Sequence, residues 1–168
     1  IYKMIQYKAA ISIIKKTRLK LVDEKISILD AVNRISSSDI KSPSINPLHN
    51  NTAFDGFAVI AKETKGISTN HPKRFKIIKT IAAGDIPKIK NYSKNSVIEI
   101  MTGGLIPKPF DSVLAVEKAK YFPSEERPTH IIIKQEIKKF SFVRFAGEDY
   151  KLNDLVVKKG EIIQPKHI

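Results

Sequence analysis

Asp55 lies in a segment whose side chains can bind a cation or a polar ligand. The chain has 168 residues, and Asp55 is the sole acid between Asp39 and Glu63. It follows Asn51 and Thr52 and directly precedes a predicted strand. Carboxylate, amide and hydroxyl oxygens suit Mg²⁺ or a polar ligand. The alternative is an Asp-Gly turn whose polar neighbours cap the loop backbone, and the residue types alone favour that turn.

A second segment, Thr102-Gly103-Gly104, follows another predicted strand. Paired glycines can present consecutive N–H groups as an anion-binding nest, and the Thr102 hydroxyl adds a donor. The segment lacks the Gly-Lys-Ser/Thr ending of a nucleotide-binding P-loop, and it is not a dinucleotide fingerprint. A tight turn is the alternative, because all three residues are common in turns.

A third segment carries two adjacent acids, Glu148 and Asp149, close after Arg144. Such carboxylates could hold a cation or orient a polar group. In an extended chain the two acids would point to opposite faces, so they would not act as one pair. A surface ion pair with Arg144 is the alternative, because such pairs are common and weak.

Composition excludes several classes of site. The chain has no cysteine and four scattered histidines, so disulfides, cysteine nucleophiles and a histidine zinc site are not expected. It carries 30 Lys and Arg against 17 Asp and Glu, a formal net charge of +13. Residues 61–100 hold nine bases and three acids, net +6, which would attract a polyanion or simply form a solvated surface. There is no nucleic-acid motif, membrane-length apolar run or visible signal peptide, so we expect a cytoplasmic protein.

The apolar pattern predicts a helical start and a β-rich body. Apolar residues at helical spacing predict an amphipathic packing helix over 3–17, and a capping pattern at Ser27 predicts a short helix over 27–34. Two prolines predict an extended linker over 42–47. A hairpin turn is expected at 158–160, between Val156-Val157 and Ile162-Ile163. Short apolar runs predict strands at 57–60, 75–81, 96–101, 113–117, 130–137 and 155–157.

In this order, the segments resemble one family, the molybdopterin molybdenumtransferases, which include the E domain of gephyrin. The resemblance rests on residues 47–58 (PLHNNTAFDGFA), 99–107 (EIMTGGLIP) with 110–117 (FDSVLAVE), 144–149 (RFAGED) and 159–165 (KGEIIQP). It covers nearly the whole chain. The departures mostly keep side-chain shape: Thr52 replaces Ser, Phe54 replaces Met, Phe57 replaces Tyr, Gly104 replaces Ala, and Asn50 replaces the commoner Asp.

The resemblance implies an α+β, β-rich fold of bifurcated or coiled sheets. Residues 1–48 and 143–168 would form a discontinuous scaffold domain with short helices, and residues 49–142 an inserted β-rich domain. The family's pterin-binding third domain and C-terminal β domain have no counterpart in this chain. We therefore expect this chain to be the N-terminal region of a longer protein and to be inactive alone.

The resemblance also implies an activity. Family members insert molybdenum from molybdate into adenylylated molybdopterin and release AMP with Mg²⁺. They are homodimers, with molybdopterin adenylyltransferase as the pathway neighbour. The cleft lies between the second domain of one subunit and the third domain of its partner. A non-catalytic interaction or scaffold module and a polyanion-binding basic domain are the alternatives.

Seven residues are the expected site residues of this chain. By resemblance, Asp55, Thr102 and Asp149 match the positions implicated in activity. By the chemistry of their side chains, Asp55 would bind Mg²⁺ through water, and Asp149 would do the same or position a lysine from the partner's cleft. The substrate and its phosphate would contact Thr102, Gly103, Gly104, Asn51 and Thr52.

Overall fold

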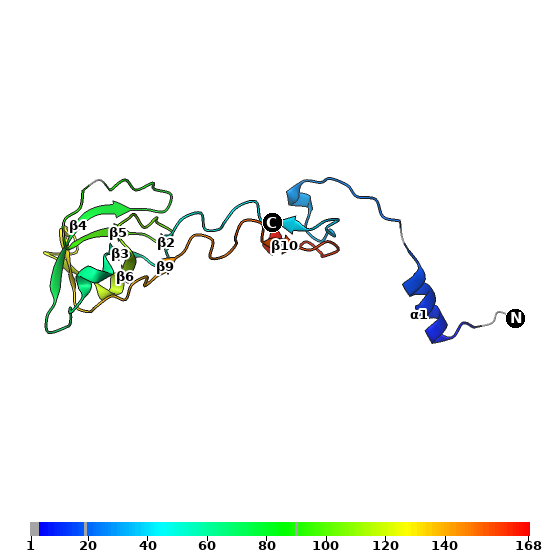
Figure 1. The fold of residues 1–168 in the computed structure, drawn as a ribbon, viewed down its shortest axis with the longest axis horizontal. Coiled ribbons are helices and arrows are strands. Elements are labelled where there is room, and N and C mark those ends of the chain that lie inside the picture. The colour runs from blue at the N-terminus through cyan, green and yellow to red at the C-terminus, as the bar shows by residue number, and fades with distance from the viewer. Residues whose placement is uncertain (1–3, 19, 90) are drawn as a thin grey trace. The chain divides into compact units, whose positions relative to one another are not determined.

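The computed structural model describes residues 4–18, 20–89 and 91–168. Contacts divide the chain into two units (Figure 1). One unit consists of Ile1–Ile40 and Leu155–Ile168, and the other is Lys41–Asp154. The first unit is therefore discontinuous in sequence. The family-domain boundaries expected at 48 and 143 stay a prediction.

The first unit begins with helix α1 (Tyr7–Lys16), which is shorter than the predicted helix over 3–17. Lys3 lies outside the described residues. Lys15 and Lys16 occupy the last turn, where positive charge complements the helix dipole. None of the α1 side chains is buried, so the packing partner expected for its apolar face is not found among the described residues.

The helix predicted over 27–34 is a single 3-10 turn, η1 (Ile28–Asp30), so that prediction was too long. Ser27 Oγ accepts a hydrogen bond from the Leu29 amide, as expected for a capping residue. Strand β1 (Ile40–Lys41) then pairs with β10 (Leu155–Val157). The unit ends in the 3-10 helix η4 (Pro165–His167).

The hairpin predicted around 158–160 is wrong. A turn does form there, closed by a hydrogen bond from Glu161 N to Lys158 O. The two arms do not pair with each other, because β10 pairs with β1 and Ile162 bridges Ile35. Both arms therefore take partners from the N-terminal segment.

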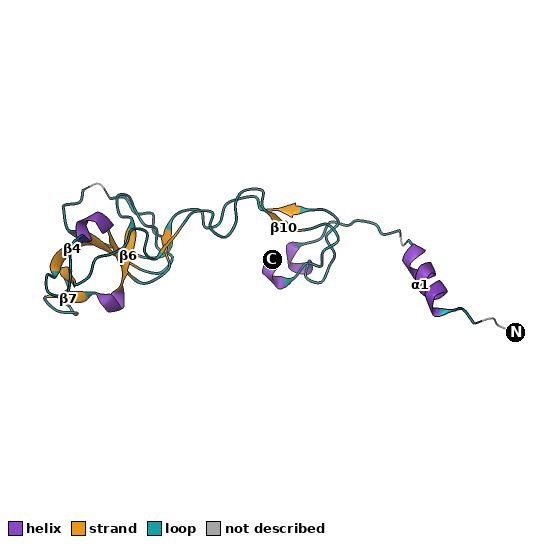
Figure 2. Cartoon of the chain, turned by 60° about the horizontal axis from the view of Figure 1, so that its bottom comes forward, coloured by secondary structure: helices purple, strands orange, loops and turns teal. Residues whose placement is uncertain are grey.

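The second unit is built on a six-stranded sheet of order β6-β3-β5-β4-β8-β7. Figure 2 shows these strands in orange, gathered in this unit. All neighbouring pairs are antiparallel except β4 and β5, which are parallel. The strands of the sheet are β3 (Gly56–Val59), β4 (Lys73–Ile81), β5 (Ser96–Ile100), β6 (Ser112–Ala115), β7 (Lys120–Phe122) and β8 (His130–Ile133).

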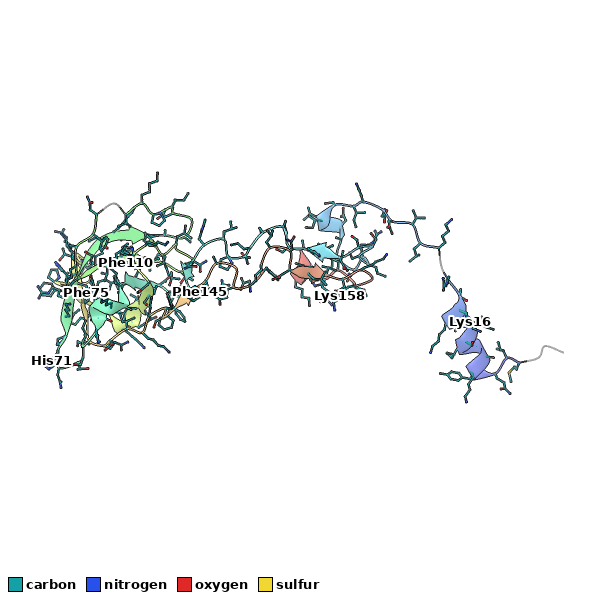
Figure 3. The ribbon with its side chains drawn as sticks, in the orientation of Figure 1. Lys16, His71, Phe75, Phe110, Phe145 and Lys158 are labelled. Carbon is teal, nitrogen blue, oxygen red and sulfur yellow. The ribbon has the colours of Figure 1, made fainter. Side chains whose placement is uncertain are left out.

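Apolar side chains cover both faces of this sheet. Phe57, Val59 and Phe75 belong to one buried cluster, whereas Ala58 and Phe110 belong to another. Figure 3 labels Phe75 and Phe110, one from each cluster. Because alternate residues of a strand point to opposite faces, β3 contributes to both clusters and is buried throughout. This rigid strand begins one residue after Asp55.

Gly56 is required by close packing and not by a special backbone angle. A Cβ atom at this position would lie 2.0 Å from the carbonyl oxygen of Leu114 on β6. Its φ is not positive, unlike those of five other glycines. A glycine is therefore needed at position 56 for packing, and not for the Asp-Gly turn that the sequence suggested.

The predicted strands are confirmed, although several boundaries move. The runs at 113–117 and 130–137 end earlier, and the first continues into the 3-10 helix η3 (Val116–Lys118). The short strands β2 (Asn51–Thr52), β7 and β9 (Val143–Arg144) and the 3-10 helix η2 (Ala61–Thr64) were not predicted. The α+β, β-rich class is confirmed. No helix within the described ranges has both the length and the apolar character needed to cross a membrane.

Candidate functional site

The first two sequence segments meet at Asp55 and Thr102. The Thr102 backbone amide donates to Oδ1 of Asp55 at 2.6 Å, and the Thr102 hydroxyl donates to the same oxygen at 2.7 Å. Asp55 lies immediately before β3, and Thr102 lies just after β5, the antiparallel neighbour of β3. Two adjacent strands therefore place the two residues together.

This contact favours the ionised form of Asp55. The hydrogen bond from the Thr102 side chain, followed by that from the Thr102 amide, lowers the pKa of Asp55 below its ordinary value. The carboxyl group is exposed, and burial opposes the shift only weakly. Both donors contact Oδ1, and no described donor contacts Oδ2. The site thus offers one ionised carboxylate with a free oxygen.

The paired glycines do not form a free anion-binding nest. Gly103 N donates to Thr52 O at 3.0 Å, and Gly104 N donates to Met101 O at 2.8 Å. Both amides are therefore already occupied. Thr52 N donates in turn to Gly104 O at 3.1 Å, which ties the first segment to the second. The Thr52 hydroxyl is also engaged, because it donates to Phe54 O at 2.6 Å.

The third segment joins the first through strands β2 and β9. Asn51 pairs with Arg144 in this ladder. Asn50 Oδ1 also accepts a hydrogen bond from Ala146 N at 2.9 Å. Oδ1 of Asn51 is buried and has no hydrogen-bond partner within the described part of the chain. An unpaired buried acceptor is unfavourable, but an oxygen without accessible surface is out of reach of a ligand in this conformation.

Asp149 has a different environment from Asp55. One guanidinium nitrogen of Arg144 lies 2.6 Å from Oδ1 and 2.7 Å from Oδ2 of Asp149. Nδ2 of Asn46 donates to Oδ2 at 3.0 Å. The adjacent Glu148 is engaged elsewhere, because its Oε2 accepts from Phe145 N at 2.8 Å. The ion pair considered for Arg144 is present, and it raises the pKa of Arg144.

The two predicted metal ligands do not fit a cation equally well. Asp55 has a charged carboxylate with an uncommitted oxygen, which suits Mg²⁺ held largely through water. Asp149 is neutralised by Arg144, whose positive charge would repel a cation. The described residues contain no group of three or more His, Cys, Asp or Glu that could hold a metal. Arg144 thus opposes a cation at Asp149, and the metal roles expected for Asp55 and Asp149 both stay predictions.

The site also contains Asn46, which the sequence did not single out, and Asn50, which the sequence placed in a motif without a site role. Asn46 contacts the Asp149 side chain and accepts the Asp149 amide on its carbonyl oxygen at 2.9 Å. Asn50 connects the first and third segments. Asn50 lies in the first motif of the resemblance. Asn46 precedes a proline, which predicts an extended backbone but does not predict which residue Asn46 contacts.

Comparison with known proteins shows the family to which this chain belongs. Residues 5–168 match the family described as the MoeA N-terminal region, domains I and II. A protein of Methanocaldococcus jannaschii named for molybdopterin biosynthesis is 33% identical over 173 residues, covering 100% of this chain and 40% of that protein. A molybdopterin molybdenumtransferase of Staphylococcus epidermidis is 30% identical, covering 93% of this chain and 36% of the enzyme.

A solved structure of a family member also matches this chain. The crystal structure of a molybdopterin biosynthesis MoeA protein from Pyrococcus horikoshii OT3 matches with a TM-score of 0.78 and 27% identity. The match covers 85% of this chain and 36% of the other. This chain thus spans well under half the length of the relatives it matches.

Proposed function

Because this chain belongs to the family of MoeA N-terminal regions, we propose that it is the N-terminal part of a molybdopterin molybdenumtransferase. The whole protein would insert molybdenum from molybdate into adenylylated molybdopterin and release AMP in the cytoplasm. The single observation that carries the proposal is the exposed Asp55 carboxylate, oriented by two donors from Thr102 that lower its pKa. The relatives' names support the wider role in molybdopterin biosynthesis.

Asp55 is the residue of this chain best suited to act on the substrate. Thr102 fixes Oδ1, so Oδ2 is the oxygen left to face a ligand. Mg²⁺, when bound there through water, would supply positive charge that stabilises the departing phosphate. Thr102 is a positioning residue, since both of its donors act on Asp55. Asn51 stays an expected substrate contact through the resemblance, although its Oδ1 is buried in this conformation.

Asp149 has a positioning role in this proposal. It anchors Arg144 and Asn46, which belong to segments on either side of the site. Because β9 also pairs with β2, this anchor holds the Asn50–Asn51 region in place. Loss of Asp149 would therefore disturb the site without removing a ligand.

The complete site requires parts outside this chain. The match to 36–40% of the relatives' length supports a longer protein. The exposed Tyr7 and Ile14 of helix α1 are compatible with the homodimer that the resemblance implies. The expected pathway neighbour is the adenylyltransferase that makes the adenylylated substrate.

The test is the Asp55→Asn variant in the full-length protein, assayed with adenylylated molybdopterin, molybdate and Mg²⁺. Asn keeps an oxygen to accept from Thr102 but loses the charge, so we expect turnover to fall about 100-fold. Asp85→Asn is the matched control, because Asp85 is also exposed and caps a loop through Ala82 N. Wild-type turnover in Asp55→Asn would remove Asp55 from the mechanism. This chain alone should show no turnover.

A further inference from the structure

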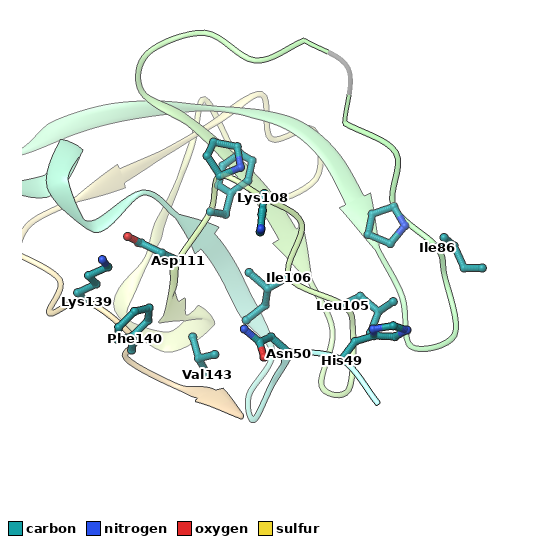
Figure 4. A pocket seen from close by; sticks show the side chains of 13 residues that line it. His49, Asn50, Ile86, Leu105, Ile106, Lys108, Asp111, Lys139, Phe140 and Val143 are labelled. Carbon is teal, nitrogen blue, oxygen red and sulfur yellow. The ribbon is translucent and has the colours of Figure 1, made fainter. Parts of the chain in front are cut away.

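A cavity of about 710 Å³ opens in the second unit, and neither Asp55, Thr102 nor Asp149 lines it (Figure 4). We propose that this cavity binds a small aromatic molecule carrying one negative charge. Its volume lies within the range of about 300–1,000 Å³ typical of small-molecule sites. Asn50 of the candidate site lines the cavity, but the Asp55 carboxylate does not, so the proposal does not depend on the proposed activity.

The cavity walls are mostly apolar. Leu105, Ile106 and Val143 line it together with the buried Phe110 and the exposed Phe140. Aromatic and aliphatic walls of this kind suit a flat apolar ligand, because rings pack against rings at their edges and faces. A fully polar ligand such as inorganic phosphate would make no apolar contacts with these walls.

The charges at the cavity select an anion. Lys108 and Lys139 line it, and neither makes an ion pair within the described part of the chain. The one acidic residue at the cavity, Asp111, already accepts hydrogen bonds on Oδ1 from Ala61 N and Ser112 Oγ. Two lysines and one aspartate leave a net charge of +1, which a single negative charge would neutralise.

Phe140, which lines the cavity, has a backbone conformation that is unfavourable for its residue type. Its φ is +67°, a left-handed conformation that is rare for a bulky side chain. The conformation is fixed by hydrogen bonds from Phe140 N to Ser112 Oγ at 2.8 Å and to Asp111 O at 3.2 Å. Strained residues of this kind concentrate at ligand sites. Lys139 Nζ lies 4.8 Å from the centroid of the Phe140 ring, so the cation and the aromatic wall are adjacent.

The test uses anilinonaphthalene sulfonate, an aromatic monoanion whose fluorescence rises on binding, titrated against the purified chain. We expect saturable binding at one site. The double variant Lys108→Glu with Lys139→Glu should weaken that binding at least about tenfold, because both attractive charges become repulsive. The matched control is Lys94→Glu with Lys118→Glu, which makes the same charge change at exposed residues that do not line the cavity. This control should retain affinity within about twofold.

A neutral probe separates charge from apolar contact. Phenylnaphthylamine lacks the sulfonate, so its affinity should be weaker and should not change in the cavity variant. Equal losses in both double variants, or no loss in the cavity variant, would overturn the proposal. So would an affinity that falls as protein concentration rises, because a second copy would then occupy the cavity. If circular dichroism shows that the glutamate variant is not folded, the double variant Lys108→Gln with Lys139→Gln replaces it in the same titration.

Discussion

Thr102 donates two hydrogen bonds to one oxygen of Asp55, from its amide at 2.6 Å and its hydroxyl at 2.7 Å. The hydroxyl makes the larger contribution to the lowered pKa of Asp55. Replacing Thr102 by Val removes the hydroxyl and keeps the shape of the side chain. We therefore expect Thr102→Val to raise the pKa of Asp55 towards its ordinary value, measured by carboxyl-carbon NMR titration.

The sign of the linked stability change follows from that shift. A carboxyl group with a lowered folded-state pKa stabilises the fold at pH values above its unfolded-state pKa. That stabilisation is lost as pH falls through the folded-state value. The difference in unfolding free energy between wild type and Thr102→Val should therefore shrink in acid. Thr129→Val, which removes a hydroxyl that contacts Phe122 and His130, should leave the titration of Asp55 unchanged.

Gly56 provides a test of the close packing beneath Asp55. A Cβ at this position would meet Leu114 O at 2.0 Å, and strands β3 and β6 are both buried. We expect Gly56→Ala to lower the unfolding free energy by about 3 kcal/mol in urea denaturation, because the strands must separate to admit the methyl group. The loss would persist at all pH values, unlike that of Thr102→Val.

Gly66→Ala separates this steric effect from the intrinsic preference of glycine. Gly66 has a φ of +78° and no heavy atom within 4 Å of an added Cβ. Only backbone strain opposes the substitution, so we expect a loss of about 1 kcal/mol. A loss at position 56 no greater than that at position 66 would contradict the packing argument.

The strands were predictable from sequence because their burial leaves a local pattern. Phe57 and Val59 face one cluster and Ala58 faces the other, so β3 reads as a continuous apolar run. Strand β2 escaped prediction because it contains only Asn51 and Thr52, which carry no apolar pattern. The failed hairpin has a related cause. The apolar pair Ile162-Ile163 indicated a strand, but its partner Ile35 lies far away in the sequence.

Most residues of the candidate site were predictable from sequence, Asn46 excepted, but the hydrogen bonds between them were not. The motifs identified Asp55 and Thr102, and the structure joins them. The role expected for the amides of Gly103 and Gly104 depended on where they point. That direction is set by pairing with Thr52 and by the turn at Met101, and residue types alone do not specify it. The pairing of Asp149 with Arg144 likewise separated two acids that the sequence treated as equivalent metal ligands.

Thr64 provides a test of a buried hydrogen bond in the second unit. Its side chain is fully buried, donates to Ala61 O at 2.7 Å and accepts from Ile137 N at 2.9 Å. Thr64→Val keeps the volume but leaves the Ile137 amide without an acceptor. We expect a loss of about 1–3 kcal/mol in unfolding free energy, measured by urea denaturation.

Thr64→Ser is the matched variant, because it keeps both hydrogen bonds and removes one methyl group. We expect it to lose about 1 kcal/mol. Valine is the more apolar residue, so a simple burial argument would rank the two variants in the opposite order. A Thr64→Val protein more stable than Thr64→Ser would show that the hydroxyl is not needed.

The Arg144–Asp149 pair should contribute to activity more than to stability. Both side chains are 39% exposed, and an exposed ion pair contributes about 0.2–1 kcal/mol. A double-mutant cycle with Arg144→Gln and Asp149→Asn should therefore give a coupling below about 1 kcal/mol in urea denaturation. Added salt should reduce that coupling further, because solvent ions screen exposed charges. In the full-length protein, the same Asp149→Asn change should lower turnover about tenfold or more, since the anchor for the Asn50–Asn51 region is lost. A coupling of several kcal/mol that salt does not change, or a loss of turnover that stability alone accounts for, would instead assign the pair to the scaffold.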